Sequence, residues 1–252
     1  MQYASASSAD IEALEARRHA IIYRLPDKHP LARLRVRYLI GQLVRNLTLQ
    51  TVFRDLSKKE YANIGAGGNI LQGYINVDYG WVAGLDLCWD ITKKLPLPSN
   101  SLKGVFTEHT LEHLVWSDAL KVMLPETFRI LKPGGTIRIS VPDAEKAVDL
   151  YNEARRDGTT SNRWREPYDG GDRIPMTPML SLNNTFRRVY EPLYMGHKFA
   201  YDFQTLEYFL HLTGFVEIRK EKYMCGRDET LLVDYKKRAS ESLYVEASKP
   251  AA

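Results

Sequence analysis

The stretch YANIGAGGN, residues 61–69, constrains the fold more than any other part of the sequence. A short apolar run, typical of a buried strand, leads directly into Gly65, Gly67 and Gly68, with Ala66 among them. Glycine has no Cβ and tolerates positive φ, so the backbone there can approach a ligand closely. The pattern suits a nucleotide-like cofactor at the carboxyl edge of a parallel sheet, although a G-x-G by itself can also be a tight turn.

A second apolar run, YINV, follows and ends at Asp78. An acidic residue at the end of a second strand can accept hydrogen bonds from both ribose hydroxyls of a nucleotide. Asp78 comes 13 residues after Gly65, whereas the nicotinamide fingerprint needs about 20 and a third glycine that opens a helix. Residues 65–73 are also short for a crossover, so either the first helix is reduced to a turn or the two runs do not pair. Because a shortened helix would cradle phosphates poorly, we expect a nucleoside cofactor without phosphates.

The next segments alternate between strand and helix patterns. GVFT and TIRISV read as strands, and residues 117–131 read as a helix with Ser117 as its cap and a kink or split at Pro125. Asp90 follows another short apolar run, where it could hold an adenine amino group or be a turn aspartate. This alternation predicts an α/β fold with a mainly parallel sheet.

The second half of the chain loses and then regains regularity. Residues 144–200, rich in arginine and proline, show no periodic pattern. A helix capped by Asp202 and ended by Gly214 then precedes two closing strands, VEIRKEKY and SLYVEAS.

These motifs together resemble class I S-adenosylmethionine-dependent methyltransferases, most closely the type 11 group with a short first loop. The strings NIGAGG, NVD, DIT, LPLPSNSL, LEH, RILKPGG and IRISVPD occur in the order and spacing of that family over roughly residues 59–225. The resemblance implies a Rossmann-like class I methyltransferase fold, with a mainly parallel seven-stranded sheet and a shortened first crossover. It implies a methyltransferase domain over residues 59–252, an N-terminal helical extension over residues 1–58, and an acceptor-side insertion at 144–200.

The resemblance also implies a cofactor site for S-adenosyl-L-methionine. Its residues would be Gly65, Ala66 and Gly67 at the methionine and ribose, Asp78 at the ribose hydroxyls, Asp90 and the Ile91 backbone at the adenine, and Glu108 with His109 beside the transferring methyl. Lys103 departs from the family, which usually has aspartate there, and Pro125 is rare in the helix before LKPGG. Both departures concern local geometry rather than the class.

The string His109-Thr-Leu-Glu112-His113 spells H-x-x-E-H, which is also a zinc-peptidase pattern. In such an enzyme both histidines must lie one turn apart on one helix face. His109 lies at the junction that follows the strand GVFT, so we expect the two rings to diverge, and nothing around Glu191 supports it as a third ligand. The sequence therefore predicts no metal.

Methyl transfer to a hydroxyl needs a base, whereas transfer to an unprotonated amine does not. Histidine suits that role because its ordinary pKa is near 6.5. Among the candidates, His113 is expected to be structural, and His109 and His197 are predicted to be catalytic. The acceptor is predicted to contact side chains of the irregular stretch, namely Trp164, Tyr168, Arg173, Tyr190 and Tyr194.

Composition and simple sequence patterns limit the partners and the cellular location that we expect. The net charge of +4 is mild and disfavours nucleic acid. Cys88 and Cys225 are too few for a disulfide framework or zinc site, and no run reaches the 18 apolar residues of a membrane span. The N-terminus lacks the order of a secretory signal, so the expected location is cytoplasmic. A basic amphipathic helix near residues 36–47 could touch an anionic membrane, but packing on the main domain with its arginines in water is favoured.

The sequence thus predicts a methyltransferase acting on a small molecule, at oxygen rather than nitrogen. A saccharide acceptor rests on the family resemblance alone. Two alternatives stay open: an RNA or protein methyltransferase that docks through the N-terminal arginines, and a non-catalytic cofactor-binding scaffold of the same fold. The oligomeric state is left open.

Overall fold

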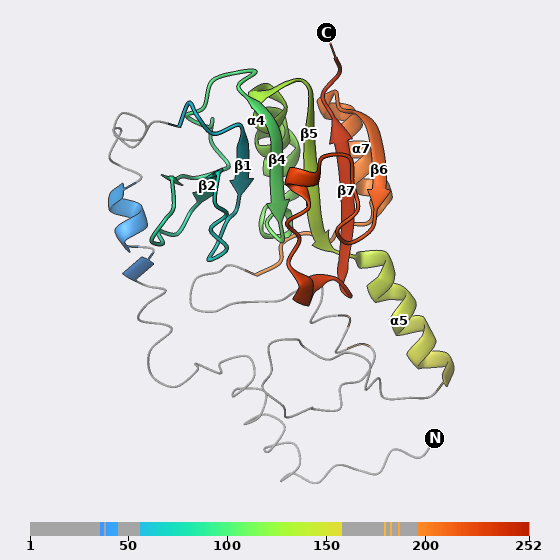
Figure 1. The fold of residues 1–252 in the computed structure, drawn as a ribbon. Helices are drawn as coiled ribbons and strands as arrows, with labels where there is room; N and C mark the ends of the chain where they lie inside the picture. Colours follow the sequence, from blue (N-terminus) through green and yellow to red (C-terminus); the bar gives the residue numbers. More distant parts are fainter. Residues whose placement is uncertain are drawn as a thin grey trace.

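A computed structural model describes residues 36–37, 39–44, 56–157 and 196–251, together with the single positions 179, 182 and 186. Figure 1 shows a central sheet with helices α4 and α7 behind it and α5 projecting from one end. The predicted acceptor residues Trp164, Tyr168, Arg173, Tyr190 and Tyr194 lie outside the described residues. Among the described residues, no helix has both the length and the apolar character that crossing a membrane requires.

The sheet has seven strands in the order β3-β2-β1-β4-β5-β7-β6. Their bounds are β1 Tyr61–Ile64, β2 Tyr74–Asp78, β3 Leu87–Cys88, β4 Leu102–Glu108, β5 Leu131–Pro142, β6 Val216–Glu221 and β7 Ser242–Ser248. The first five strands pair in parallel, and β7 pairs antiparallel with both β5 and β6. The predicted fold class is confirmed, and with it the mainly parallel seven-stranded sheet of a Rossmann-like methyltransferase fold.

The first crossover is reduced to turns, as one of the two sequence alternatives predicted. Strands β1 and β2 pair directly, with Tyr61 opposite Tyr74. Two buried asparagines hold the short connection in place, because Asn63 donates both to Asn69 O (2.9 Å) and to the Asn76 side chain (3.1 Å). The Asn76 side chain is therefore a partner for the buried polar groups of this connection.

The predicted helix before β5 forms as three consecutive helical segments. These are α3 Trp116–Asp118, the π-helical η2 Ala119–Met123 and α4 Leu124–Ile130. The π-helical turn comes just before Pro125, which has no N–H to donate, and the backbone stays helical at both junctions, so the helix changes type there and is not split. The predicted Ser117 cap is wrong, because the helix begins one residue earlier at Trp116, and Val115 precedes it without a side-chain cap.

Helix α5, Ala144–Asp157, corrects the prediction of irregular chain from residue 144 onward. The Asp143 side chain caps it by accepting from Lys146 N at 3.1 Å. Its buried side chains among the described residues are two alanines, Ala147 and Ala154, one on each of two turns of the same face. The helix α7, Phe203–Thr213, matches its prediction, with the Asp202 cap accepting from Thr205 N at 2.8 Å and Gly214 at φ 99°.

The two faces of the sheet are covered differently. Helices α4 and α7 lie behind it (Figure 1), where Leu206 and Leu210 join the main core. The front carries the chain between β6 and β7, which includes the short turns η3 Glu229–Leu231 and η4 Lys236–Arg238. Leu231 is fully buried there against Tyr74 and Phe106. An extended segment thus covers part of a sheet face that helices usually cover in this fold class.

Arg138 of β5 attaches this front segment to the sheet. It is fully buried, and it forms ion pairs with Asp234 of the segment (2.6 Å) and Glu246 of β7 (2.8 Å). It also donates to the backbone oxygens of Cys225 (2.8 Å) and Lys222 (3.1 Å). Burying a guanidinium is favourable only when its charge is paired and its donors are satisfied, and both conditions hold here.

The N-terminal helical residues, 36–37 and 39–44, pack on the domain through an unexpected face. Arg37 Nε donates to Trp81 O at 3.0 Å, and Cys88 Sγ lies 3.7 Å from Gly41 O. Val36 and Leu43, expected to face the domain, are 51% and 69% exposed. Packing on the domain is confirmed, and Val44 of the predicted apolar face does contact a buried cluster of the domain, but the assignment is wrong for Val36, Leu43 and Arg37. The Arg37 guanidinium donates to a backbone carbonyl at the edge of the sheet, and the helical periodicity of the sequence does not predict such a contact.

Candidate active site

The glycine turn after β1 and the end of β2 are joined by hydrogen bonds at the carboxyl edge of the sheet. Gly65 and Gly67 adopt φ of 78° and 55°, which side chains rarely adopt. The Gly67 amide donates to Asp78 Oδ2 at 2.7 Å, and the Gly80 amide donates to Asp78 Oδ1 at 2.8 Å. The predicted partners Gly65, Gly67 and Asp78 therefore lie together. The arrangement forms a compact cradle in which each carboxylate oxygen keeps a lone pair for a ligand.

A close contact with Thr110 also requires glycine at position 65. A Cβ on Gly65 would lie 2.0 Å from Thr110 Oγ1, which is far inside van der Waals contact. Thr110 follows β4, so this approach brings the turn after β1 against the residues after β4. By contrast, a Cβ on Gly68 would meet open space.

Burial and neighbouring groups act in opposite directions on the pKa of Asp78. Burial raises the pKa of the Asp78 carboxyl, whereas the amides of Gly80 and Gly67 lower it. Arg37 and His113 also lower this pKa through their charge. The N-terminal helix thus places a cation beside the ribose-binding candidate, and Arg37 Nη2 lies 3.5 Å from Gly67 O.

Asp90 and Ile91 lie just after β3, at the same edge. Asp90 Oδ1 accepts from the Thr92 amide at 3.0 Å and from the Thr92 hydroxyl at 2.7 Å. Asp90 is therefore the turn aspartate that the sequence allowed, and its Oδ2 lies 3.9 Å from Lys93 Nζ. Ile91 packs against the main core. The structure leaves the predicted adenine contacts of this pair as a proposal.

Glu108 ends β4 and contacts the front segment. Its Oε1 accepts from the Tyr235 amide at 3.0 Å. Burial raises the pKa of the Glu108 carboxyl, and the Tyr235 amide lowers it less. Tyr235 was not predicted, since a backbone amide in a distant loop carries no sequence signal.

A cluster of histidines surrounds the buried Glu112, beyond the end of β4. His109 Nε2 lies 2.7 Å from Ser242 Oγ, and His109 Nδ1 lies 3.3 Å from Glu112 Oε1. His197 Nε2 lies 4.0 Å from the same oxygen, and the His113 and His197 rings meet edge to face at 5.1 Å. The predicted catalytic residues His109 and His197 are thus brought to one carboxylate. The sequence did not assign roles to Glu112 and Ser242, although Glu112 was visible in H-x-x-E-H.

Glu112 is charged in this environment. Burial raises the pKa of its carboxyl, but the three imidazoles outweigh burial and lower it to about 2. The backbone fixes the cluster, because the Lys198 amide donates to Glu112 O at 2.6 Å and His113 Nδ1 lies 3.3 Å from Gly196 O. The chain around residue 196 is thereby tied to the short helix η1, Leu111–His113.

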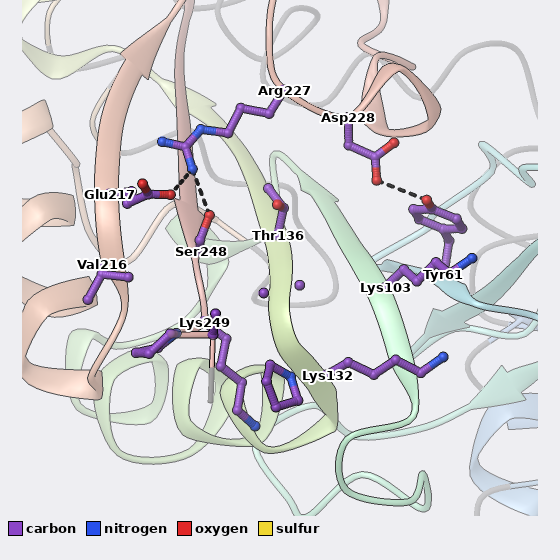
Figure 2. A pocket seen from close by; sticks show the side chains of 15 residues that line it. Tyr61, Lys103, Lys132, Thr136, Val216, Glu217, Arg227, Asp228, Ser248 and Lys249 are labelled. Carbon is purple, nitrogen blue, oxygen red and sulfur yellow. Dashed lines mark hydrogen bonds and ion pairs between the residues drawn. The ribbon is translucent and has the colours of Figure 1, made fainter.

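A groove with many cations lies at the opposite edge of the sheet, where β1 and β5 begin (Figure 2). Its lining includes Tyr61, Thr136 and Lys249. Its other cations are already neutralised: Lys103 and Lys132 by Glu60, and Arg227 by Glu217. The groove therefore offers little uncompensated charge, and it is remote from the cradle at the carboxyl ends of the strands.

Comparison with known families identifies the domain. Residues 46–139 match a family model described as a methyltransferase domain, of type 11. The match covers less than half of the chain and is consistent with a class I methyltransferase of the type 11 group. The order of its sheet and the glycine turn after β1 agree with that class. The protein is therefore an S-adenosylmethionine-dependent methyltransferase, and its cradle of glycines and Asp78 fits a nucleoside cofactor.

Similar solved structures are distant. One is a possible histamine N-methyltransferase from Thermotoga maritima, with 15% identity, a TM-score of 0.44, and coverage of 94% of this chain and 95% of that one. Another is a methyltransferase from Archaeoglobus fulgidus, with 16% identity, a TM-score of 0.46, and coverage of 84% and 94%. A third is 1,6-didemethyltoxoflavin-N1-methyltransferase from Burkholderia thailandensis, with 13% identity, a TM-score of 0.43, and coverage of 99% and 93%. No curated protein matches the chain.

Proposed function

We propose that this methyltransferase transfers the methyl group of S-adenosylmethionine to a hydroxyl oxygen of a small molecule, a saccharide or a related metabolite. The observation that carries the proposal is the juxtaposition of two features at one sheet edge. The cradle of Gly67 and Asp78 adjoins, through the contact of Gly65 with Thr110, a buried cluster of histidines around Glu112. The saccharide is suggested by the family resemblance.

The donor would be held by residues after β1, β2, β3 and β4. In this proposal Gly65, Ala66 and Gly67 line the methionine and ribose, Asp78 accepts from the ribose hydroxyls, Asp90 and the Ile91 backbone meet the adenine, and Glu108 lies beside the methionine. The bound donor supplies a methyl group already activated on a sulfonium. The protein's task is then to align the acceptor with that methyl.

His109 and His197 are the proposed catalytic residues on the acceptor side. A hydroxyl acceptor loses a proton during attack, and a positioned imidazole can take it up. His109 Nε2 lies 2.7 Å from the Ser242 hydroxyl, which would have to move aside for an acceptor hydroxyl to reach this nitrogen. On the other side of the ring, Glu112 faces His109 Nδ1 at 3.3 Å, which is the orientation expected of a group that positions a base.

The domain organisation is proposed on the same basis. Residues 59–252 form the methyltransferase domain, residues 1–58 an extension, and residues 144–200 an acceptor-side insertion whose Trp164, Tyr168, Arg173, Tyr190 and Tyr194 contact the acceptor. The proposed location is cytoplasmic. Alanine at Trp164, Arg173 or Tyr194 is expected to raise the KM for the acceptor while leaving donor affinity unchanged. An unchanged KM in all three variants would remove the insertion from the acceptor site.

The test of the proposed reaction is methyl transfer from isotopically labelled S-adenosylmethionine to a panel of acceptors. The panel contains saccharides with free hydroxyls, small amines, RNA and protein. A labelled methyl ether on a saccharide is expected, identified by mass spectrometry and NMR. Products confined to amines, RNA or protein would contradict the proposal. Donor binding without transfer to any acceptor would favour the non-catalytic scaffold.

A further inference from the structure

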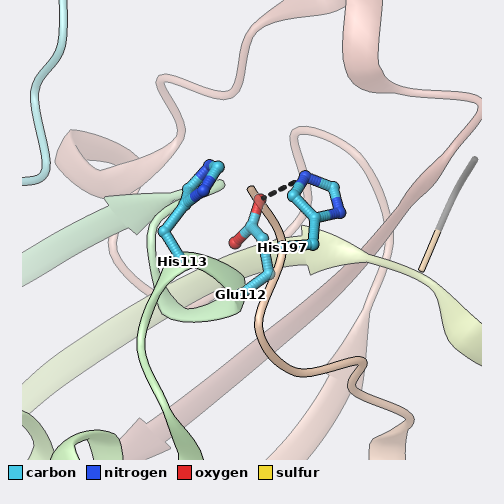
Figure 3. A group of neighbouring side chains, drawn as sticks. All are labelled: Glu112, His113 and His197. Atoms are coloured by element: carbon cyan, nitrogen blue, oxygen red, sulfur yellow. Dashed lines mark ion pairs between the residues drawn. The ribbon is translucent and has the colours of Figure 1, made fainter. Parts of the chain in front are cut away.

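We infer that Glu112, His113 and His197 form a binding site for a divalent metal ion of the zinc class. One ligand atom from each of the three side chains lies within 4.8 Å of the others. Figure 3 shows the two imidazoles on either side of the carboxylate, with His197 coming from a separate segment. Two imidazoles and one carboxylate are a ligand set that Zn²⁺ and Fe²⁺ prefer, with at least one coordination position left for an exogenous ligand.

The burial of Glu112 supports a cation at this place. The residue is 1% exposed, and neither carboxylate oxygen accepts a hydrogen bond from the described residues. Its contact with His109 Nδ1 at 3.3 Å and its contact with His197 Nε2 at 4.0 Å involve groups that are cationic only when protonated. When these histidines are neutral, as metal ligation requires, the buried carboxylate has neither a hydrogen bond nor a cationic partner among the described residues, which is costly, and a bound metal ion would compensate it directly.

The surroundings of His113 prepare its ring for coordination. Its Nδ1 lies 3.3 Å from Gly196 O, and a carbonyl can only accept, so Nδ1 carries the proton in this contact. This tautomer leaves Nε2 with a lone pair for a metal ion. Metal-binding histidines commonly donate their other ring N–H to a backbone carbonyl in this way.

Metal binding would require the three ligand atoms to move closer together. Zinc holds its ligand atoms at about 2.0–2.2 Å, which in a tetrahedron places them ~3.4 Å from one another. The ligand atoms lie within 4.8 Å of one another, so the widest pair would close by ~1.4 Å at most. The His197 side chain is 8% exposed, so closing this distance would require its surroundings to adjust together with the ring.

The site differs from the peptidase arrangement that the sequence suggested and set aside. That arrangement pairs His109 with His113, whereas this site takes Glu112 and His113 from H-x-x-E-H and His197 from elsewhere. His109 would contact the ligand Glu112 from outside. The inference differs from the expectation of no metal, because the approach of His197 could not be seen in the sequence. It does not depend on the proposed acceptor. With a metal ion bound, His197 would be a ligand and not a base, which leaves His109 as the residue available for proton uptake.

The test is metal binding by the full-length protein, freed of any affinity tag and treated with a chelator. Zn²⁺ binding is measured by calorimetry without S-adenosylmethionine, and Co²⁺ binding by its visible absorption spectrum. We expect one equivalent of metal per chain. The variants Glu112→Gln, His113→Ala and His197→Ala should each weaken Zn²⁺ binding at least tenfold, and should remove the Co²⁺ band.

Two variants serve as controls. His211→Ala removes an exposed histidine of α7, and Cys225→Ser removes an exposed thiol that could bind zinc adventitiously. Both should retain one equivalent. Thermal unfolding of each variant without metal identifies any that fails to fold, and the variants of His113 and His197 provide tests besides Glu112. The inference is wrong if the wild-type protein binds neither ion, if the three ligand variants bind like wild type, or if Cys225→Ser abolishes binding. Failure of the acceptor screen would leave these outcomes unaffected.

Discussion

Replacing Arg138 with methionine should destabilise the protein strongly, because Arg138 connects β5 to the segment that covers the front of the sheet. All five N–H donors of the guanidinium have partners: two on Asp234, one on Glu246, and the backbone oxygens of Cys225 and Lys222. The substitution keeps an unbranched apolar stem, although a shorter one, and it leaves two buried carboxylates without their cation.

The magnitude follows from that uncompensated charge. Removing one partner of a buried ion pair costs ~3–5 kcal/mol. For a chain of this size, each kcal/mol lowers Tm by about 2–4 °C, so the expected fall is about 6–20 °C. Urea denaturation followed by circular dichroism measures the free energy of unfolding, and a thermal scan measures Tm. Arg156→Met on the exposed surface of α5 is the matched control and should change stability by less than ~0.5 kcal/mol.

A compensated variant separates charge from packing. Arg138→Met combined with Asp234→Asn and Glu246→Gln removes the whole buried network, and it should recover part of the lost stability, since neutral groups cost less to bury than unpaired charges. A single variant that loses less than ~1 kcal/mol would refute the reasoning, because the buried carboxylates would then not depend on Arg138.

Two further predictions concern the cradle. Gly65→Ala should weaken S-adenosylmethionine binding at least tenfold in a calorimetric titration, because its Cβ would lie 2.0 Å from Thr110 Oγ1 at a φ of 78°. The control Gly68→Ala places its Cβ in open space and should bind like wild type. Equal affinities of the two variants would contradict the geometry. Arg37→Ala removes the 3.0 Å hydrogen bond to Trp81 O and a cation near the cradle. It should weaken donor binding about two- to tenfold in the same titration. An unchanged affinity would contradict a role for the N-terminal helix.

Local patterns make the central part of the fold predictable. A strand that runs into glycines, followed by a second strand that ends at an acidic residue, is enough to place Gly65 and Asp78 at one edge of a parallel sheet. Pro125 and the pair Asp202 and Gly214 likewise mark helix boundaries, because missing donors and caps act within a few residues of the chain.

Contacts between distant segments could not be predicted in the same way. Arg138 reads as a solvent-facing residue of an alternating strand, yet its partners come from Asp234 and Glu246, which are distant in the chain. The approach of His197 to Glu112 depends on where the chain returns after a long excursion. Neither contact leaves a period or a motif, so only the folded arrangement shows it.

Binding of the methyl donor tests the central claim most directly. Calorimetric titration of the full-length protein with S-adenosylmethionine and S-adenosylhomocysteine should give micromolar affinity. Asp78→Ala should weaken that affinity at least tenfold, which corresponds to about 1.4 kcal/mol or more, whereas Asp149→Ala on the exposed face of α5 should leave it unchanged. Absence of binding by the wild-type protein, or affinity that Asp78→Ala leaves intact, would contradict the assignment of the cradle as the donor site.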